Sequence, residues 1–563
     1  MRSNNLYNKN KVNKSEIINE VLIVIIVYFS YLCKIFWMIG FFMNKRVYNV
    51  VFDTHTVTGI VISVALYIIF FAGTLSFLRE EIEVWEQNTP MIESSFGTTD
   101  FDKLLKELEK EISLYSQNIS LIPNGKTRLI VVELSKDKPI EEVKKQEAEE
   151  VETDYFTIDP TTGQITNYED DYSLGQFFYQ LHFFDPFNLW GYSRLLVGLV
   201  TFFFLFTLIT GLIIHWDKII QNFYVFRPKN AWKNIWTEAH TVLGLIGLPY
   251  QLMYAITGAF FITGSLLFVE PAQQLVYGGD QKKIDALYEH RDEIRTTFLN
   301  RPLQTDFSVN EWVEKAKRLF PNTSVKEINL THYGDESMLV KVVSAPIFSK
   351  NFTGSYSVVY QVADGEILQQ QAPSEVSYTD ALNEVMTHLH FGDYGGYGVK
   401  LMYILLGFLG CVVILSGVLI WLVARDKKNI SEHKRKQNRW VANVYLSLCL
   451  SMLPATAFVF LIIKLLGGFM IDKQLWIYSL FFGSWGVLSL FFILRRNNFV
   501  TNRYTLLLSG LWGMLIPITD GLVTGNWLWN SALKGETAIF VVNLFWLLVS
   551  IITLWVFFKL KKQ

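Results

Sequence analysis

Six of the nine histidines in the chain lie at the ends of long apolar segments. Ionisable side chains at such positions are costly and usually functional, and imidazole is a common ligand of haem iron and transition metals. The alternative is that these are interfacial side chains satisfied by lipid headgroups or by the backbone. Their number and spacing favour ligation of a metal or a haem by His55, His182, His215, His240, His388 and His390.

The first of these histidines belongs to an internal repeat. The sequence FDTHTVTG around His55 returns as EAHTVLG around His240, 185 positions later. Each copy opens a long apolar run, and a glycine follows at the same distance in both, at Gly73 and Gly258. Repeats of this period are informative about a whole fold.

The second half of the unit is repeated as well. LHFFD, which contains His182, matches LHFGD, which contains His390, and the run TGLII at 210–214 matches SGVLI at 416–420. Each copy is therefore a histidine at the mouth of a span, a polar lobe, an LHF motif and a second span. This symmetry predicts that one histidine from each copy contributes to each site.

Composition indicates a membrane protein with parts outside the bilayer. The chain is 51% hydrophobic and only 18% charged, and several apolar runs reach the roughly 20 residues that cross a bilayer. The net charge of −2 does not point to a nucleic-acid partner. We predict a polytopic α-helical membrane protein with a duplicated two-span core, two extracytoplasmic α+β lobes and four C-terminal spans.

The predicted organisation has four parts. Residues 1–43 hold an apolar segment, either a span or an uncleaved anchor, and Met43 offers an alternative start. The repeats cover 44–215, with a lobe at 80–180, and 216–425, with a lobe at 270–385; residues 426–563 form the C-terminal extension. The predicted spans are about 57–79, 193–215, 241–268, 399–424, 441–464, 474–494, 504–525 and 537–558.

The two lobes contain the same order of elements. The first has a helical stripe in 101–114, an alternating run at 127–134 and a strand–turn–strand pattern, YFTIDPTTGQI, at 155–165. An insert rich in both charges at 136–154 is predicted to be a solvated hairpin tip. In the second lobe Ser308 and Glu311 form a capping box, and the strands ESMLVKVVSA and SYSVVYQVADGEIL follow.

Basic residues orient the spans. If the loop at 425–439 is cytoplasmic, the basic residues near 495–503 and at the C-terminus also lie inside, and both lobes lie outside. His55, His215 and His240 are then at the cytoplasmic level, and His182, His388 and His390 at the outer level.

The pattern around the histidines favours haem over a metal ion bound by protein alone. No HExxH motif, paired carboxylates or CxxCH motif is present, and histidines on separate helices among Gly, Phe and Leu suit a flat apolar macrocycle. Small residues such as Gly59, Gly73, Gly244 and Gly258 permit close approach. We predict two haems with axial ligands His55 and His240 at the inner site, and His182 and His390 at the outer site.

Other residues compete for these roles. His215 could replace an inner ligand, and its counterpart in the second copy is Trp421. His388 is a weaker outer candidate, because residues i and i+2 do not share a helix face. Arg194 and Lys400 occupy matching positions at the outer lip, where they could contact haem propionates or simply extend toward the interface.

Helix length limits the depth of the outer site. The 33 residues from His182 to His215 would span about 50 Å as one helix, whereas the hydrocarbon core is about 30 Å thick. We therefore expect a helix break at Pro186 and Gly191, and at Gly392, Gly395 and Gly396 in the second copy.

The remaining histidines and the cysteines carry simpler predictions. His290, His332 and His433 lie in polar stretches and are predicted to be exposed to solvent. The three cysteines, Cys33, Cys411 and Cys449, lie in apolar runs without ligand spacing and are predicted to be buried packing residues.

Together these motifs resemble the PepSY-associated transmembrane family over roughly residues 45–425. The resemblance rests on the HTVxG openings, the TG pairs within the spans, the LHF motifs and the DPTTGQI and ADGEI lobes. The family includes ferri-siderophore reductases of the bacterial inner membrane with two b-type haems. It implies reduction of a ferric siderophore or other ferric chelate outside the cytoplasm, with His55, His182, His240 and His390 as haem ligands.

The electron donor and the C-terminal spans are less defined. No GxGxxG or P-loop motif is present, so the donor would be a quinol or a separate cytoplasmic reductase. Lys464 and Asp520 could line a quinol site or serve in packing. The competing interpretation is a non-redox PepSY membrane protein that binds or inhibits a peptidase or senses a ligand; a transporter is disfavoured because paired, broken spans are missing from the sequence pattern.

Overall fold

The computed structural model describes residues 44–89, 91–92, 95–97, 99–136, 154–167, 170–216, 232–263, 294, 296–345, 351–375, 378–426 and 430–560. Four predictions lie outside these residues: the apolar segment at 1–43, the burial of Cys33 within it, most of the insert at 136–154, and the exposure of His290.

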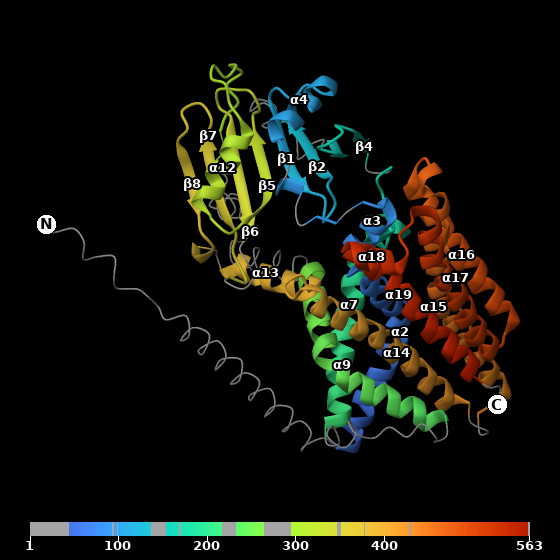
Figure 1. Ribbon diagram of the computed structural model, residues 1–563. Coiled ribbons are helices and arrows are strands. Elements are labelled where there is room, and N and C mark those ends of the chain that lie inside the picture. Colours follow the sequence, from blue (N-terminus) through green and yellow to red (C-terminus); the bar gives the residue numbers. More distant parts are fainter. Residues whose placement is uncertain are drawn as a thin grey trace.

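Within the described residues, eight helices are long and apolar enough to cross a membrane. Each predicted span corresponds to one of them, and their bounds differ from the prediction mainly where polar first turns extend the helix. Four form the duplicated core, and the other four form a C-terminal bundle beside it (Figure 1). In chain order they are α2 (Lys45–Ser76), α7 (Ser193–His215), α9 (Trp232–Thr263), α14 (Gly396–Arg425), α15 (Glu432–Leu466), α16 (Lys473–Arg495), α17 (Asn498–Thr524) and α19 (Thr537–Lys559).

The polar lobes join in one antiparallel sheet of eight strands at one end of the bundle (Figure 1). Its order is β4-β3-β2-β1-β5-β6-β7-β8. The first lobe supplies β1 (Gln117–Pro123), β2 (Ile130–Lys136), β3 (Asp154–Ile158) and β4 (Ile165–Asn167). The second supplies β5 (Ser324–Thr331), β6 (Leu339–Ala345), β7 (Tyr356–Gln361) and β8 (Ile367–Gln371).

The two halves of the sheet meet where β1 pairs with β5, with Leu121 opposite Ile328. Each half carries one amphipathic helix, α4 (Phe101–Glu111) or α12 (Val309–Leu319), whose apolar side joins the common core. Ser308 caps α12 as predicted, by accepting a hydrogen bond from the amide of Glu311. The two lobes are therefore one structural unit, a junction that the sequence pattern did not predict.

Short helices connect the sheet to the spans. They are α3 (Arg79–Gln87), α6 (Leu174–His182) and α13 (Tyr378–Phe391). The predicted breaks are present: α6 ends at His182 and a 3-10 turn, η2 (Asp185–Phe187), precedes α7. Gly191, Gly392 and Gly396 adopt φ values of +80°, +64° and +56°, a conformation that glycine tolerates best. The LHF histidines thus lie on short helices, separate from the spans.

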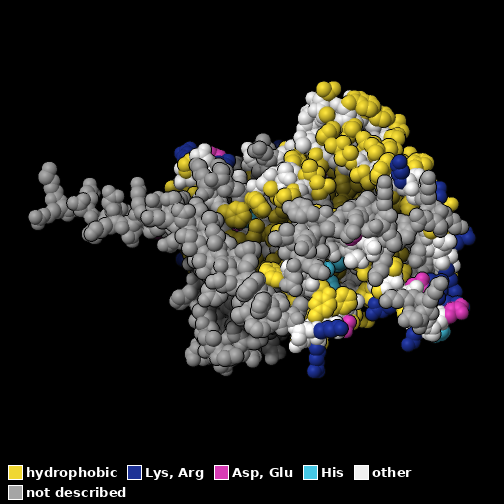
Figure 2. Space-filling model, turned by 90° about the horizontal axis from the view of Figure 1, so that it is seen from below, with side chains coloured by type: hydrophobic (Ala, Val, Ile, Leu, Met, Phe, Trp, Pro, Cys, Tyr) yellow, Lys and Arg dark blue, Asp and Glu magenta, His cyan; other side chains and the backbone are white. Residues whose placement is uncertain are grey.

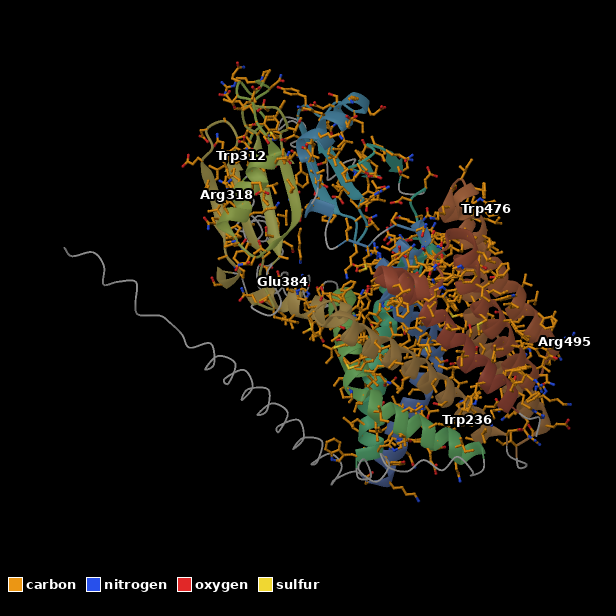
Figure 3. The ribbon with its side chains drawn as sticks, viewed as in Figure 1. Trp236, Trp312, Arg318, Glu384, Trp476 and Arg495 are labelled. Atoms are coloured by element: carbon orange, nitrogen blue, oxygen red, sulfur yellow. The ribbon has the colours of Figure 1, made fainter. Side chains whose placement is uncertain are left out.

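We call the two ends of the bundle sheet-proximal and sheet-distal. Trp476 and Arg495 lie toward opposite ends of α16 (Figure 3). Basic residues gather at the sheet-distal end, where helices start or finish with Lys45, Arg46, Arg425, Arg495, Arg503 and Lys559. His433 is exposed at this end, as predicted.

The prediction for His332 was wrong, because its side chain is fully buried. It lies between β5 and β6, and its Nδ1 is 3.0 Å from the hydroxyl of Ser337, which in turn donates to Asp335. A polar stretch can bury a histidine when local partners satisfy its nitrogen atoms. Cys411 and Cys449 are buried and unbridged, as predicted, and Cys33 lies outside the described residues.

Candidate paired histidine centres

Two cavities lie at the two ends of the four-helix core made by α2, α7, α9 and α14. The sheet-proximal cavity has a volume of about 470 Å³ and the sheet-distal cavity about 320 Å³. Seen from the sheet-distal end, histidine side chains are visible near hydrophobic side chains, with lysines and arginines on the same face (Figure 2). Each cavity contains one of the predicted histidine pairs.

The sheet-distal pair consists of His55 on α2 and His240 on α9, with ring centres 6.3 Å apart. Their Nδ1 atoms lie 3.0 Å from the carbonyl oxygens of Thr207 and Val413, respectively. Thr207 on α7 and Val413 on α14 occupy matching positions in the two copies, 206 residues apart. The repeat therefore conserves both the histidine and its hydrogen-bond acceptor.

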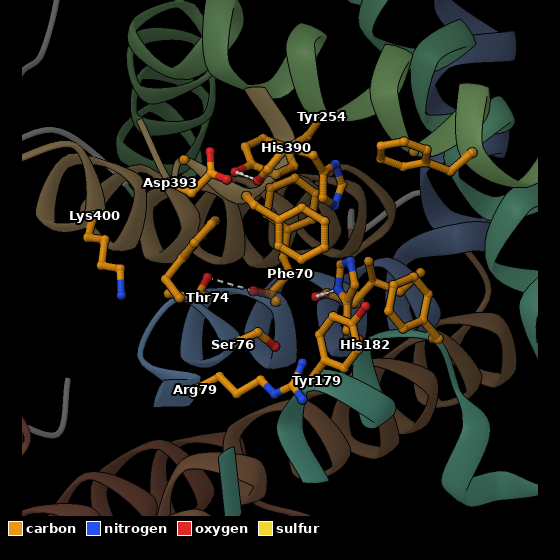
Figure 4. Close-up of a pocket in the computed structure, with 18 of the residues that line it drawn as sticks. Phe70, Thr74, Ser76, Arg79, Tyr179, His182, Tyr254, His390, Asp393 and Lys400 are labelled. Atoms are coloured by element: carbon orange, nitrogen blue, oxygen red, sulfur yellow. Dashed lines mark hydrogen bonds between the residues drawn. The ribbon is translucent and has the colours of Figure 1, made fainter. Parts of the chain in front are cut away.

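The sheet-proximal pair consists of His182 on α6 and His390 on α13, with ring centres 6.0 Å apart. Both imidazoles point into the same cavity (Figure 4). The Nδ1 of His182 lies 2.9 Å from the carbonyl oxygen of Ile69, whereas the Nδ1 of His390 lies 2.8 Å from the hydroxyl of Thr257. Here the two copies differ, because alanine occupies the position that matches Thr257 in the first copy, at residue 72.

These hydrogen bonds determine which ring nitrogen is available. A carbonyl oxygen only accepts, so Nδ1 carries the proton in the three histidines that face a carbonyl. The hydroxyl of Thr257 donates to the carbonyl of Met253 at 2.8 Å, so its oxygen accepts from Nδ1 of His390. All four rings therefore present Nε2 with a free lone pair, the arrangement that outer hydrogen bonds commonly impose on ligand histidines.

The ring separations fit one metal between two imidazoles. A metal–imidazole bond is about 2.0–2.1 Å long, as in zinc proteins, so two opposed bonds place the nitrogens about 4 Å apart and the ring centres roughly 6 Å apart. The observed separations are 6.0 and 6.3 Å. No group of three or more His, Cys, Asp or Glu that could hold a metal ion occurs in the described part of the chain. The residues thus fit a centre with two protein ligands.

Glycines make room for three of the four rings. A Cβ at Gly73 would lie 2.7 Å from Nδ1 of His182, and one at Gly211 or Gly417 would lie 3.0 or 3.2 Å from Cε1 of His55 or His240. Gly73 was among the predicted glycines. Gly211 and Gly417 were not predicted to lie beside a histidine. Their matching positions in the second span of each copy are a sequence signal that could have identified them.

Comparison with known proteins identifies the family of the duplicated core. The family model described as the PepSY-associated TM region matches residues 52–424. The chain belongs to this family. It is also similar to the uncharacterized protein PA4219 of Pseudomonas aeruginosa, with 20% identity over 241 residues, which is 41% of this chain and 60% of that protein. The PepSY-associated region ends at the close of α14, so α15 to α19 lie beyond it.

The other candidate ligands of the PepSY-associated core have different positions. His215 lines the sheet-distal cavity together with Trp421, so it stays a possible alternative ligand there. His388 does not line the sheet-proximal cavity, and its Nδ1 is 2.9 Å from a carboxylate oxygen of Asp393.

The two predicted cations at the lip also differ. Lys400 lines the sheet-proximal cavity, and its ammonium is 2.7 Å from the buried carboxylate of Glu81. Arg194 is 72% exposed, pairs with Asp185 at 3.0 Å and is not among the residues that line the cavity. The structure therefore brings Lys400, but not Arg194, to the cavity.

Two unpredicted cations line the sheet-proximal cavity. Arg79 begins α3 and lies 4.6 Å from the centre of the Tyr179 ring (Figure 4). Lys126 belongs to the β1–β2 turn, Asn124–Lys126, which reaches from the sheet to the cavity. Arg79 sits in an ordinary charged run, and the turn is adjacent only in three dimensions, so no local sequence signal identified either.

Burial shifts the protonation of groups around this cavity. Transfer from water lowers the pKa of His182, and lowers that of His390 to about 3, so both imidazoles are neutral near pH 7. Burial and the nearby Asp171 raise the pKa of Glu83, another lining residue, to about 7.

An apolar wall separates the cavities. Leu66 and Phe204 line both of them, and Phe70 packs edge-on against Phe204 with ring centres 5.4 Å apart. Along α2, His55 is 14 residues from Ile69, the partner of His182, which corresponds to about 21 Å. The two centres therefore lie at two levels of one membrane-spanning core.

Proposed function

We propose that the chain is a haem-containing transmembrane electron-transfer protein that reduces a ferric siderophore or other ferric chelate outside the bacterial inner membrane. The observation that carries this proposal is the two pairs of imidazoles at two levels of the core, each pair lining one cavity with ring centres 6.0 or 6.3 Å apart. Each cavity would hold one haem b. When bound, the haems would supply one-electron redox chemistry.

The residues of the chain supply ligands, orientation and dry surroundings. His55 and His240 would bind the iron at the sheet-distal level, and His182 and His390 at the sheet-proximal level. The carbonyls of Thr207, Val413 and Ile69 and the hydroxyl of Thr257 fix the ring orientation. The apolar side chains of Leu66 and Phe204 line both cavities and lie between the two levels.

Charge distribution supports the direction of transfer. The basic helix ends at the sheet-distal side are typical of the cytoplasmic face, which would place the sheet outside. One electron would enter at the sheet-distal level from a quinol or a separate cytoplasmic reductase. One Fe³⁺ would be reduced to Fe²⁺ near the sheet-proximal cavity; a two-electron quinol donor would serve two such reductions and release two protons.

Visible spectroscopy tests this proposal directly. Purified protein should contain two haems per chain and show sharp, low-spin bands on reduction with dithionite. His55→Ala and His182→Ala should each lower the content to about one haem, whereas the exposed control His433→Ala should leave it at two. Colourless protein, or equal haem content in all variants, would refute the electron-transfer function and leave the peptidase-binding or ligand-sensing interpretation.

A further inference from the structure

The buried Trp85 on α3 contacts two C-terminal spans, α15 and α19. It is fully buried, and its Nε1 donates to the side-chain oxygen of Asn543 on α19 at 3.1 Å. The ammonium of Lys464 on α15 donates to the carbonyl of Trp85 and lies 4.3 Å from the centre of its ring. We call Trp85, Lys464, Asp520 and Asn543 the Trp85 cluster.

The cluster closes on itself through Asp520 on α17. One carboxylate oxygen is 2.8 Å from the ammonium of Lys464, and the other accepts from the side-chain amide of Asn543 at 2.7 Å. Lys464 and Asp520 are only 3% and 0% exposed. Lys464 and Asp520 are absent from the lining of both cavities. Of the two roles suggested by the sequence, this favours packing over a quinol site.

A buried ion pair is weak evidence for stability alone, because apolar residues of similar size often stabilise a protein as well or better. A closed cycle of hydrogen bonds also fixes how the helices that contribute to it are arranged. Here the cycle joins three spans of the C-terminal bundle to one short helix of the duplicated core.

That short helix is coupled directly to the helix of one candidate ligand. The carboxylate of Glu86 on α3 accepts from the amide of Leu174, the first residue of α6, at 2.8 Å, and it also pairs with Lys473 at the start of α16. A Cβ at Gly175 would lie 2.3 Å from the carbonyl oxygen of Arg79, so α3 and α6 are in backbone contact. Eight residues after Leu174, α6 ends at His182.

The other face of α3 borders the sheet-proximal cavity through Arg79, Glu80 and Glu83. The helix therefore lies between the C-terminal bundle and the candidate centre. The opposite ligand is held differently, because the carbonyl of His390 accepts from the hydroxyl of Tyr254 on α9 at 2.7 Å. Through Glu86, the C-terminal bundle is connected to the side of the centre that holds His182.

We propose that the C-terminal spans position one candidate ligand of the sheet-proximal centre, with the Trp85 cluster fixing α3 and, through it, α6 and His182. The members of the cluster are positioning residues, since none of them touches the cavity. This inference rests on the proposed function for the haem readout below, and the backbone readout is independent of it.

The test compares two buried asparagines of the same bundle. Asn543→Leu removes the partner of Trp85 and Asp520. Asn443→Leu is the matched control, because Asn443 is also buried but donates to the carbonyl of Ile493 on α16 at 3.1 Å and lies 21 residues before Lys464 on α15. Trp85→Phe is a milder variant that keeps an aromatic ring and loses one N–H donor.

The first readout is hydrogen–deuterium exchange of the α6 amides, measured without reference to haem. We expect at least tenfold faster exchange in Asn543→Leu and a smaller increase in Trp85→Phe, with α13 unchanged in both. Asn443→Leu should leave α6 at the native rate. The proposal would be overturned if the α6 amides exchanged at the native rate in both Trp85→Phe and Asn543→Leu. It would also be overturned if Asn443→Leu accelerated their exchange as much as Asn543→Leu does. If Asn543→Leu does not fold, the result for Trp85→Phe decides.

The second readout is the midpoint potential of each haem. The haem of the sheet-proximal centre is the one that is lost in His182→Ala. In Asn543→Leu its midpoint potential should shift by about 59 mV, a tenfold change in the equilibrium of a one-electron couple. The midpoint potential of the other haem should not change. A shift of both haems, or of neither, would contradict selective positioning of His182. Colourless native protein would refute the proposed function, while exchange of α6 would still decide the positioning role.

Discussion

At the scale of single residues, the four histidines illustrate what a repeat can and cannot reveal. Their pairing could be predicted because His55 and His240 occupy equivalent positions, as do His182 and His390. The acceptors of their Nδ1 atoms could not, because they are mostly backbone carbonyls of other helices. Every residue has a backbone carbonyl, so the residue type does not show which carbonyl accepts the hydrogen bond.

The exception is Thr257, whose side chain provides the acceptor for His390. We predict that Thr257→Ala lowers the haem affinity of the sheet-proximal centre about 10- to 100-fold, the usual effect of losing such a partner. Titration of haem into apoprotein measures this. The control is Thr387→Ala on α13, whose hydroxyl donates to the carbonyl of Asn383 within the same helix; equal affinities in the two variants would contradict a role for Thr257.

Glu83 provides a pH-dependent prediction. Its pKa is raised from its ordinary value of 4.5 to about 7 by burial and by Asp171. The folded state therefore binds this proton more tightly than the unfolded state, and the stabilisation present below about pH 4.5 is lost as the pH rises through about 7. Stability should fall across this range.

Glu83→Gln, which resembles the protonated acid, should raise the apparent melting temperature at pH 8.5 and leave it unchanged at pH 4. A rise of a few degrees is expected, since 1 kcal/mol corresponds to about 2–4 °C in domains of 150–250 residues. Thermal unfolding in detergent measures it, with Glu111→Gln on the exposed end of α4 as the control. An equal rise at both pH values would argue against titration of Glu83.

At the scale of elements, the spans were predictable because a bilayer requires about 20 apolar residues. Five strands were anticipated from alternation or turn residues, and the run SYSVVYQVADGEIL, predicted as one strand, forms β7 and the start of β8. Strands β1 and β5, QNISLIP and SVKEINLT, were missed, because polar residues interrupt their apolar pattern. These two strands form the junction of the sheet, so the feature that makes the lobes one unit was the least visible in the sequence.

The β1–β2 turn is the element by which the sheet reaches the candidate centre. Gly125 in this turn has φ +55°, a conformation that costs other residues about 1–2 kcal/mol. We predict that Gly125→Val slows reduction of a ferric chelate severalfold without altering the haem spectrum. The matched control is Gly365→Val, at φ +78° in the β7–β8 turn and away from both cavities; equal slowing there would indicate a general effect on the sheet.

At the scale of the whole molecule, the duplicated core is nearly symmetric and the C-terminal bundle breaks that symmetry. The bundle contacts α3 through Trp85 and Glu86. The bundle therefore packs against α3, the helix that connects span α2 to the sheet in the first copy. The sequence revealed the four extra spans but not this attachment, because Lys464 and Trp85 are far apart in the chain and meet only after folding.

The orientation of the whole molecule can be tested by labelling. A cysteine at Arg318, on the exposed side of α12 (Figure 3), should react with a membrane-impermeant maleimide in spheroplasts. A cysteine at Gln437, exposed at the sheet-distal start of α15, should react only after permeabilisation. The background carries Cys33→Ser, and the buried Cys411 and Cys449 remain. The reverse pattern would place the sheet in the cytoplasm.

Each centre takes one histidine from each copy, and this bears on ancestry. A single unit holds only half of either centre, so no centre could have existed before two units came together. The halves of the sheet meet through equivalent strands that run antiparallel, which is the contact expected of an isologous dimer. The present chain thus has the strand pairing expected of a fused homodimer, and Thr257 and Ala72 are matching positions at which its halves differ.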